Sequence, residues 1–136
     1  MIVLDTSVLI DGLTGPKRSA PAIRESLAEG ERMLLPALVL YEWLRGPRLS
    51  QELAAQEALF PAKSAIPFGP EEAAIAAGLC RIVKHRTLRH RTVKRPRGRE
   101  VDLGIAACAL VRGAYLWTLN PRDFRDVPGI RLYALR

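Results

Sequence analysis

The chain begins MIVLDTSVLIDG (residues 1–12), with three apolar residues running directly into a carboxylate. Ile2–Leu4 is short and wholly apolar, which is typical of a strand that a parallel sheet buries on both faces. Asp5 would then lie at the carboxyl end of this strand, at the edge where open α/β sheets bind their ligands. A simpler interpretation is that Asp5 or Ser7 caps the next helix, a common role of both residue types. This stretch alone favours the cap.

Predicted strands and helices alternate along the rest of the chain. Further strands are expected at Met33–Leu35, Ala114–Thr118 and Ile130–Ala134. Helices are expected from about Ser7 to Gly12 and at Pro21–Glu29, Pro36–Gly46, Ser50–Phe60, Pro70–Leu88 and Asp102–Arg112. Strands separated by helices predict an α/β fold with a mainly parallel sheet and helices on both of its faces.

The composition is that of an ordinary globular protein. The 136 residues are 49% hydrophobic and 26% charged, and this length suits a single domain spanning residues 1–136. No apolar stretch approaches the roughly 18 residues of a membrane helix, and the N-terminus lacks the basic leader of a secretory signal. Cys80 and Cys108 lie far apart without a CxxC spacing and are expected to be buried, reduced thiols. We therefore expect a cytoplasmic protein with no membrane contact.

The net charge of +7 comes from one segment of the chain. Residues 73–99 hold both histidines, no acidic residue and nine of the 21 lysines and arginines, so the rest of the chain is slightly acidic. A concentrated basic segment suggests a polyanion as partner. A solvated surface stretch would have the same composition, which does not separate these two interpretations. The nine residues are Arg81, Lys84, Arg86, Arg89, Arg91, Lys94, Arg95, Arg97 and Arg99.

Two carboxylates occupy positions where a surface residue is unexpected. In ALVLYEWLRG, Glu42 shares a helix face with the apolar residues three and four positions before it. A buried carboxylate needs a cation or a hydrogen-bonding partner, although a Glu42 paired with Arg45 at the helix edge is the alternative. Asp102 heads the stretch DLGIAACALV, where its apolar stripe begins and where helix capping is the alternative. Small residues such as Gly104 would let this helix pack closely on a neighbour.

Polar oxygens also follow the predicted strand AYLWT. Asn120 and Asp123 come shortly after it in LNPRDF, although NPRD alone is a common turn sequence. With Asp5, Glu42 and Asp102, they form a set of oxygen donors at strand ends or on apolar helix faces. Crowded carboxylates repel unless a cation intervenes, and oxygen ligands without His or Cys indicate Mg²⁺ or Mn²⁺. An acidic metal pocket beside a basic segment would suit a nucleic-acid backbone.

The order of these motifs resembles that of a PIN domain. LDTSVLID, the Glu42 helix, VDLGIAACAL and GAYLWTLNPRDF followed by VPGIRLY span nearly the whole chain, and they resemble the VapC-type toxins of prokaryotic toxin–antitoxin pairs. The resemblance implies a three-layer α/β/α sandwich and a Mg²⁺- or Mn²⁺-dependent endoribonuclease in a prokaryotic cytoplasm. It also implies an RNA substrate, a homodimer, and a VapB-like antitoxin that holds the toxin inactive in a larger toxin–antitoxin complex.

The resemblance also carries over site residues. Asp5, Glu42 and Asp102 match the family's three acidic metal-site positions. Asn120 stands where the family has a fourth acidic residue, and Asp123 follows three residues later. An amide at that position supplies an oxygen but no charge, so the number of metal ions stays open. These five residues are the expected catalytic set.

Other residues are expected around that set. Those expected to position a water or a ligand are Thr6, Ser7 and Thr118. Those expected to hold the RNA backbone are Lys84, Arg86, Arg89, Arg91, Lys94, Arg95, Arg97 and Arg99. The competing interpretation is a catalytically silent PIN-fold protein that binds a partner or regulates it. A phosphatase on a similar sheet would also begin with Asp after a strand, but no lysine stands in a motif to support it.

Overall fold

The computed structural model describes residues 1–90 and 99–135, and of residues 84–90 it describes the backbone alone. In the described residues, the chain forms a parallel sheet of three strands in the order β2-β1-β3. The central strand β1 (Ile2–Leu4) pairs on one side with β2 (Met33–Leu34) and on the other with β3 (Tyr115–Trp117). All three carboxyl ends therefore lie at the same edge of the sheet.

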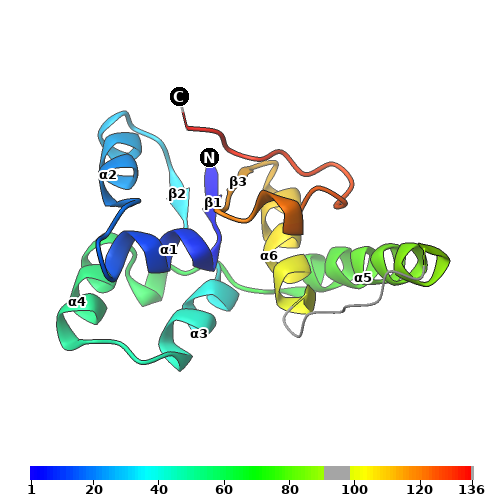
Figure 1. Ribbon diagram of the computed structural model, residues 1–136, viewed down its shortest axis with the longest axis horizontal. Coiled ribbons are helices and arrows are strands. Elements are labelled where there is room, and N and C mark those ends of the chain that lie inside the picture. Colours follow the sequence, from blue (N-terminus) through cyan, green and yellow to red (C-terminus); the bar gives the residue numbers. More distant parts are fainter. Residues whose placement is uncertain (91–98, 136) are drawn as a thin grey trace.

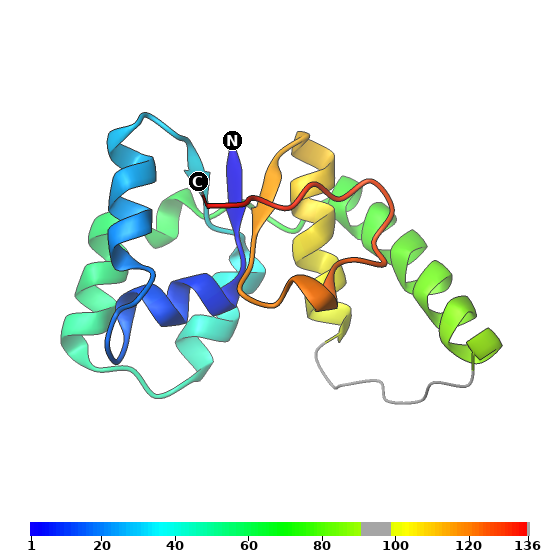
Figure 2. The same cartoon turned by 45° about the horizontal axis from the view of Figure 1, so that its top comes forward.

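Helices lie on both sides of this sheet. They are α1 (Thr6–Leu13), α2 (Ala20–Ala28), α3 (Ala37–Arg45), α4 (Ser50–Leu59), α5 (Pro70–His90) and α6 (Arg99–Arg112), with short 3-10 helices η1 (Ala62–Ser64) and η2 (Pro121–Asp123). Figure 2 shows the strands between the group α1–α4 on one side and α6 with α5 on the other. The predicted α/β fold with a parallel sheet is confirmed.

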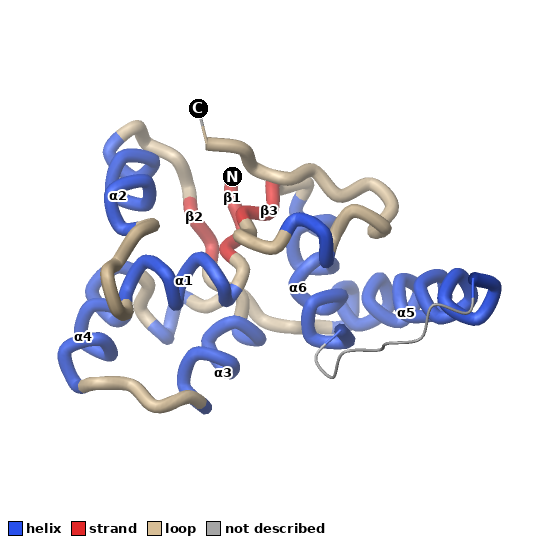
Figure 3. Tube along the Cα trace, viewed as in Figure 1, coloured by secondary structure: helices blue, strands red, loops and turns tan. Residues whose placement is uncertain are grey.

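The longest helix, α5, packs along α6 and extends away from the sheet (Figure 3). Its second half carries the first lysine and arginine residues of the basic segment, and the last residue of that segment, Arg99, begins α6. No helix in the parts of the chain that the structure describes combines the length and the apolar character needed to cross a membrane.

Two predicted element boundaries are wrong. The expected strand Ile130–Ala134 is a single parallel bridge between Leu132 and Leu116, because only the hydrogen bonds around Leu116 tie this segment to β3. The helix expected to begin at Asp102 begins three residues earlier, at Arg99. Asp102 therefore lies within the first turn of α6 and does not occupy its cap.

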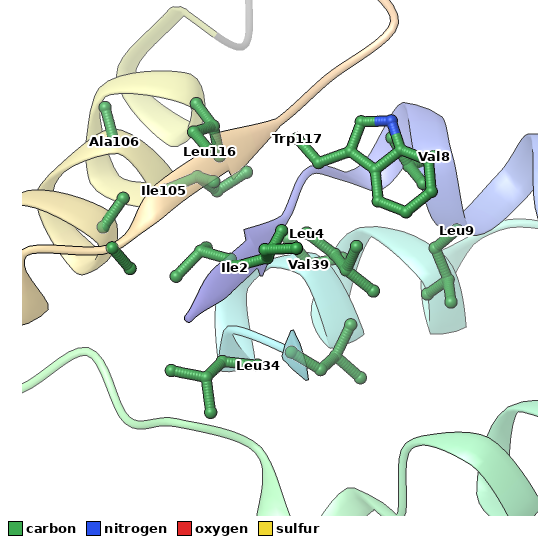
Figure 4. Close-up of a cluster of buried hydrophobic side chains, with 14 of the residues drawn as sticks. Ile2, Leu4, Val8, Leu9, Leu34, Val39, Ile105, Ala106, Leu116 and Trp117 are labelled. Atoms are coloured by element: carbon green, nitrogen blue, oxygen red, sulfur yellow. The ribbon is translucent and has the colours of Figure 1, made fainter. Parts of the chain in front are cut away.

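The core surrounds β1. Its three residues are each at most 1% exposed, so both faces of the strand are covered. Figure 4 shows Ile2 and Leu4 among Val8 of α1, Val39 of α3 and Ile105 of α6. Burial of this apolar surface is the main favourable contribution to folding. It also holds the backbone of Asp5, the next residue, in one place.

Helix α6 approaches its neighbours closely through a glycine. A Cβ atom at Gly104 would lie 2.5 Å from Leu38 Cδ1 of α3 and 3.3 Å from Phe68 Cε2. The prediction that small residues let this helix pack tightly is therefore confirmed. Both cysteines are free; Cys108 is buried and Cys80 is half-buried. Burial raises the pKa of the Cys108 thiol to about 11, which leaves it protonated and unreactive at neutral pH.

Candidate active site

Six elements of the chain carry the predicted site residues to the carboxyl edge of the sheet. Asp5 follows β1, and Thr118 follows β3, because neighbouring parallel strands end together. The remaining residues come from helices: Thr6 and Ser7 from the first turn of α1, Glu42 from α3, Asp102 from the first turn of α6, and Asn120 and Asp123 from either end of η2.

Asp5 is buried, with 5% of its surface exposed. It occupies the N-cap position of α1, but its side chain makes no capping hydrogen bond. Its Oδ2 instead accepts hydrogen bonds from Ser7 Oγ at 2.8 Å and from Thr118 Oγ1 at 2.7 Å. The interpretation of Asp5 or Ser7 as a side-chain cap is therefore wrong. Within the described residues both hydroxyls donate to the same oxygen, so Asp5 Oδ1 is the oxygen available to a ligand.

The same two hydroxyls hold the chain that follows β3. Ser7 Oγ accepts a hydrogen bond from the Leu119 backbone N–H, and Thr118 Oγ1 accepts one from the Asn120 backbone N–H, each at 3.0 Å. The two hydroxyl oxygens lie 3.5 Å apart. The carboxylate of Asp5 and the backbone of Asn120 are thus linked through one short network. Its effect is to orient Asp5 and to fix the start of the η2 segment.

Glu42 is partly buried, with 16% of its side chain exposed. Its Oε1 accepts a 2.6 Å hydrogen bond from Thr6 Oγ1. Its Oε2 lies 3.6 Å from Arg45 Nη2, across an ion pair whose arginine is mostly exposed. Glu42 is therefore both a partly buried carboxylate with a hydrogen-bonding partner and the ion-pair partner of Arg45, so its two interpretations are compatible. The link to Thr6 was not foreseen, because nothing local relates residues 36 positions apart.

Asp102 shows that the carboxylates influence one another. Its pKa is raised from 3.8 to about 7, first by burial and then by the negative charges of Asp5, Asp123 and Glu42, while Arg99 opposes them. A carboxyl group surrounded by like charges binds a proton more tightly. The four acids thus create a local excess of negative charge that a cation would relieve.

The donor set fits a hard divalent cation, because it offers carboxylate, amide and hydroxyl oxygens without His or Cys. Within residues 1–83 and 99–135, no group of three or more His, Cys, Asp or Glu side chains is drawn together closely enough to hold one ion. The acids therefore share an electrostatic field without forming a closed cage. Asp5 contributes to this field, and its Oδ1 accepts none of the hydrogen bonds that Ser7 and Thr118 donate.

Asn120 and Asp123 are both exposed at the two ends of η2. The charge of Asp123 acts on Asp102, whereas Asn120 is tied through its backbone to Thr118. The acidic neighbour on this segment is thus Asp123, three residues beyond the position that the family pattern assigns to an acid. The role of either side chain in a reaction stays a prediction.

The predicted RNA-binding residues are only partly within the described structure. Lys84, Arg86 and Arg89 belong to the last turns of α5, of which the backbone alone is described. Arg91, Lys94, Arg95 and Arg97 lie outside the described residues. The side chain of Arg99 is 18% exposed and donates to the Asp123 carbonyl oxygen and to the Asp126 carboxylate.

Sequence reasoning missed the contact between Arg99 and Asp126. The signal that could have revealed it is the spacing of Arg99, three residues before Asp102 and on the same helix face if the helix begins early enough. The helix was expected to begin at Asp102, so Arg99 was assigned to the basic segment and not to the helix that carries the site.

Comparison with known proteins agrees with this fold. The family described as PIN domain matches residues 2–130. Ribonuclease VapC19 of Mycobacterium tuberculosis is 35% identical over 131 residues, which cover 96% of this chain and 98% of that protein. Two solved structures are similar over nearly their whole length. DNA-bound VapBC from Salmonella typhimurium has a TM-score of 0.71 at 23% identity, covering 97% of this chain and 96% of that one.

VapBC2 from Rickettsia felis, bound to a promoter DNA fragment, also has a TM-score of 0.71, at 20% identity and with complete coverage of both chains. These two structures share the fold, and the mycobacterial protein shares more than a third of the sequence. The motifs quoted from the sequence lie within the matched range, except that VPGIRLY extends three residues beyond it. The chain therefore belongs to the PIN-domain family and is of the VapC type.

Proposed function

We propose that this protein is the toxin of a type II toxin–antitoxin pair and acts as a Mg²⁺- or Mn²⁺-dependent endoribonuclease. The observation that carries the proposal is the position of Asp102, whose carboxyl group lies in the combined negative field of Asp5, Asp123 and Glu42. A site of this charge attracts a divalent cation and, through it, a phosphodiester. The similarity to a protein named as a ribonuclease, over almost the full length of both chains, supports the same activity.

Asp5 and Asp102 would be the principal metal ligands. Asp5 would bind through Oδ1, since Oδ2 already accepts two hydroxyl donors. Glu42 would bind the ion or orient a water, and Asn120 and Asp123 would complete the site. The bound ion would supply charge neutralisation at the scissile phosphate and a water of lowered pKa.

The chain's hydroxyl residues would keep these carboxylates in position. Ser7 and Thr118 orient Asp5, and Thr6 orients Glu42. Partners of this kind restrict the rotation of a ligand and are important for metal affinity. The basic segment would hold the RNA backbone, because its last residue begins the helix that carries Asp102. The substrate would thus be gathered next to the acidic site.

The direct test is cleavage of RNA by the purified protein with Mg²⁺, followed by sequencing of the 5′ ends of the fragments. The Asp5→Asn variant should lose cleavage while its circular dichroism spectrum and Tm remain close to those of the wild type. Asp11→Asn is the matched control, because Asp11 lies on α1 and bonds to Ser19, away from the acidic set. Full cleavage by the Asp5 variant would exclude this assignment.

A thermal-shift titration separates the enzyme from a catalytically silent binding module. An enzyme of the proposed kind should be stabilised by Mn²⁺, and Asp102→Ala should abolish that stabilisation. A protein that shows neither ion-dependent stabilisation nor cleavage would be a PIN-fold partner-binding module.

The proposed partners are an antitoxin and a second copy of the chain. The two similar structures described above are VapBC complexes bound to DNA. An antitoxin would need to cover the acidic site, and a basic side chain would suit the charges around Asp102. Expression of this protein alone should inhibit growth of a prokaryotic host, and co-expression of the adjacent reading frame should relieve the inhibition. An absence of toxicity would count against the proposal.

A further inference from the structure

Arg99 connects two parts of the candidate site that are distant in sequence. It is the first residue of α6 and stands three residues before Asp102. Its guanidinium donates to the backbone carbonyl of Asp123 and to the carboxylate of Asp126, 24 and 27 residues further along the chain. One side chain therefore joins the helix that carries Asp102 to the segment that carries Asp123.

Apart from the bonds of Arg99, that segment is anchored at its two ends, and the Asp123 backbone N–H donates only within the segment, to the Asn120 carbonyl. Its start is tied by the Asn120 backbone N–H to Thr118 Oγ1. Its end is held by the buried side chains of Phe124 and Val127. The side chain of Asp123 is exposed between these anchors, so its distance from Asp102 depends on what links η2 to α6. Among the described residues, the bonds of Arg99 form this link next to both acids.

The environment of Arg99 differs from that of an arginine that binds RNA. Only 18% of its side chain is exposed, and its donors are directed to two oxygens of the protein itself. Phosphate contacts instead require a guanidinium that presents its donors to solvent. Arg122 and Arg125 lie on the same segment and are exposed, so they show what a surface arginine looks like in this part of the molecule.

We propose that Arg99 is a positioning residue that fixes the separation of Asp102 and Asp123. This inference rests on the proposed nuclease function for its catalytic consequence, but the link itself does not depend on it. Paired with Asp126, Arg99 holds η2 against the first turn of α6. The exposed carboxylate of Asp123 then stays beside that of Asp102, so that both can share one cation.

Arg99→Gln and Asp126→Asn, singly and together, test this link in the full-length protein. The matched control is Arg125→Gln, which removes the same charge from a neighbour of Asp126 on the η2 segment. Hydrogen exchange should show faster exchange of the backbone amides between residues 121 and 127 in both single variants. In the double variant the two effects should be less than additive, since the two side chains interact with each other. The control should leave these amides unchanged.

Kinetics then distinguish positioning from RNA binding. Arg99→Gln and Asp126→Asn should each lower kcat by about 10- to 100-fold, the usual effect of losing a partner that orients a metal ligand, with KM for RNA within about twofold. Arg99→Lys should recover part of the activity, because it keeps the charge. Mn²⁺ affinity, measured by calorimetry, should fall in the two single variants and not in Arg125→Gln.

Different results would contradict the role of Arg99 and the proposed nuclease function. A raised KM with unchanged kcat in Arg99→Gln, together with unchanged kinetics in Asp126→Asn, would make Arg99 an RNA contact and overturn the inference. Unchanged hydrogen exchange between residues 121 and 127 would overturn it as well. A wild-type protein that cleaves no RNA would exclude the proposed function alone, and the exchange experiment would still decide whether Arg99 holds η2 against α6.

Discussion

Thr6 and Glu42 are joined by a 2.6 Å hydrogen bond from Thr6 Oγ1 to Glu42 Oε1, although 36 residues separate them in the sequence. The bond links the first turn of α1 to α3 and leaves Glu42 Oε2 facing Arg45. A carboxylate held from both sides has little rotational freedom. The position of Glu42 in the candidate site is thus set by two neighbours of different kinds.

Thr6→Val should lower RNA cleavage by about 10- to 100-fold, because Glu42 loses the donor that orients it. The loss of one hydrogen bond should change the free energy of unfolding by only about 1 kcal/mol. Thr6→Ser keeps the hydroxyl and should retain activity. Thr14→Val is a matched control, since Thr14 donates to the Ile10 carbonyl at the other end of α1. Wild-type activity in Thr6→Val would show that Glu42 needs no such support.

The ionisation of Asp102 predicts how stability depends on pH in the absence of divalent ions. Its pKa is raised from 3.8 to about 7 by burial and by the neighbouring acids. Between these values the folded protein holds a proton that the unfolded chain has released, so the contribution of Asp102 to stability is complete in acid and is lost as the pH rises through about 7.

Asp102→Asn removes this titration and should therefore raise the Tm above that of the wild type at about pH 8 in EDTA. The difference should shrink as the pH is lowered to about 5. Differential scanning fluorimetry across this range measures it, with Asp11→Asn as the control. A difference that stays constant with pH would contradict the assignment of the titration to Asp102.

Phe124 is predicted to be the main apolar anchor of η2. It follows Asp123 directly and is 1% exposed. Phe124→Ala should destabilise the protein by about 3–5 kcal/mol, the usual cost of removing a buried aromatic side chain. Phe124→Leu should cost less than about 1.5 kcal/mol. Urea denaturation measures both, and Phe68→Ala, which truncates an exposed phenylalanine, should have a much smaller effect.

The basic segment is predicted to determine the salt dependence of RNA binding. For single-stranded nucleic acid, each phosphate contact contributes about 0.7 to the slope of log K against log salt concentration. Replacing Lys84, Arg86 and Arg89 by Gln should therefore reduce the slope by about 2 if all three contact the backbone. Arg24→Gln on α2 is the control. An unchanged slope in the triple variant would mean that these residues form a solvated surface.

The fold followed from the sequence because its signals are local. Ile2–Leu4 is apolar throughout and is buried on both faces, and each predicted helix and each of the first three strands has a counterpart within a few residues of its expected ends. The segment Ile130–Ala134 has the composition of a strand but pairs only around Leu132. Strand propensity measures how well side chains suit a pleated, half-buried surface. It does not predict how many residues of this segment will pair with the edge strand β3.

The sequence indicated which acidic residues lie near one another in the candidate site, but it did not indicate their contacts. The sequence around Asp5 favours a helix cap. The hydrogen bond that instead assigns its side chain to the candidate site comes from Thr118, which lies 113 residues away. The sequence assigns Arg99 to the basic segment, whereas in the structure Arg99 is the first residue of α6. In both cases the deciding partner comes from another element, and a single sequence holds no record of which elements meet.

The order of the strands has a consequence for the timing of synthesis. The centre of the sheet is made first, and its second neighbour, β3, is made more than a hundred residues later. A ribosome that has translated Asp5 and Glu42 has therefore produced Ser7, one of the two hydroxyl residues that orient Asp5, but neither Thr118 nor the acids of α6 and η2. The candidate site of this chain is therefore complete only after residue 123 has been made and the segment that follows β3 has packed next to α6.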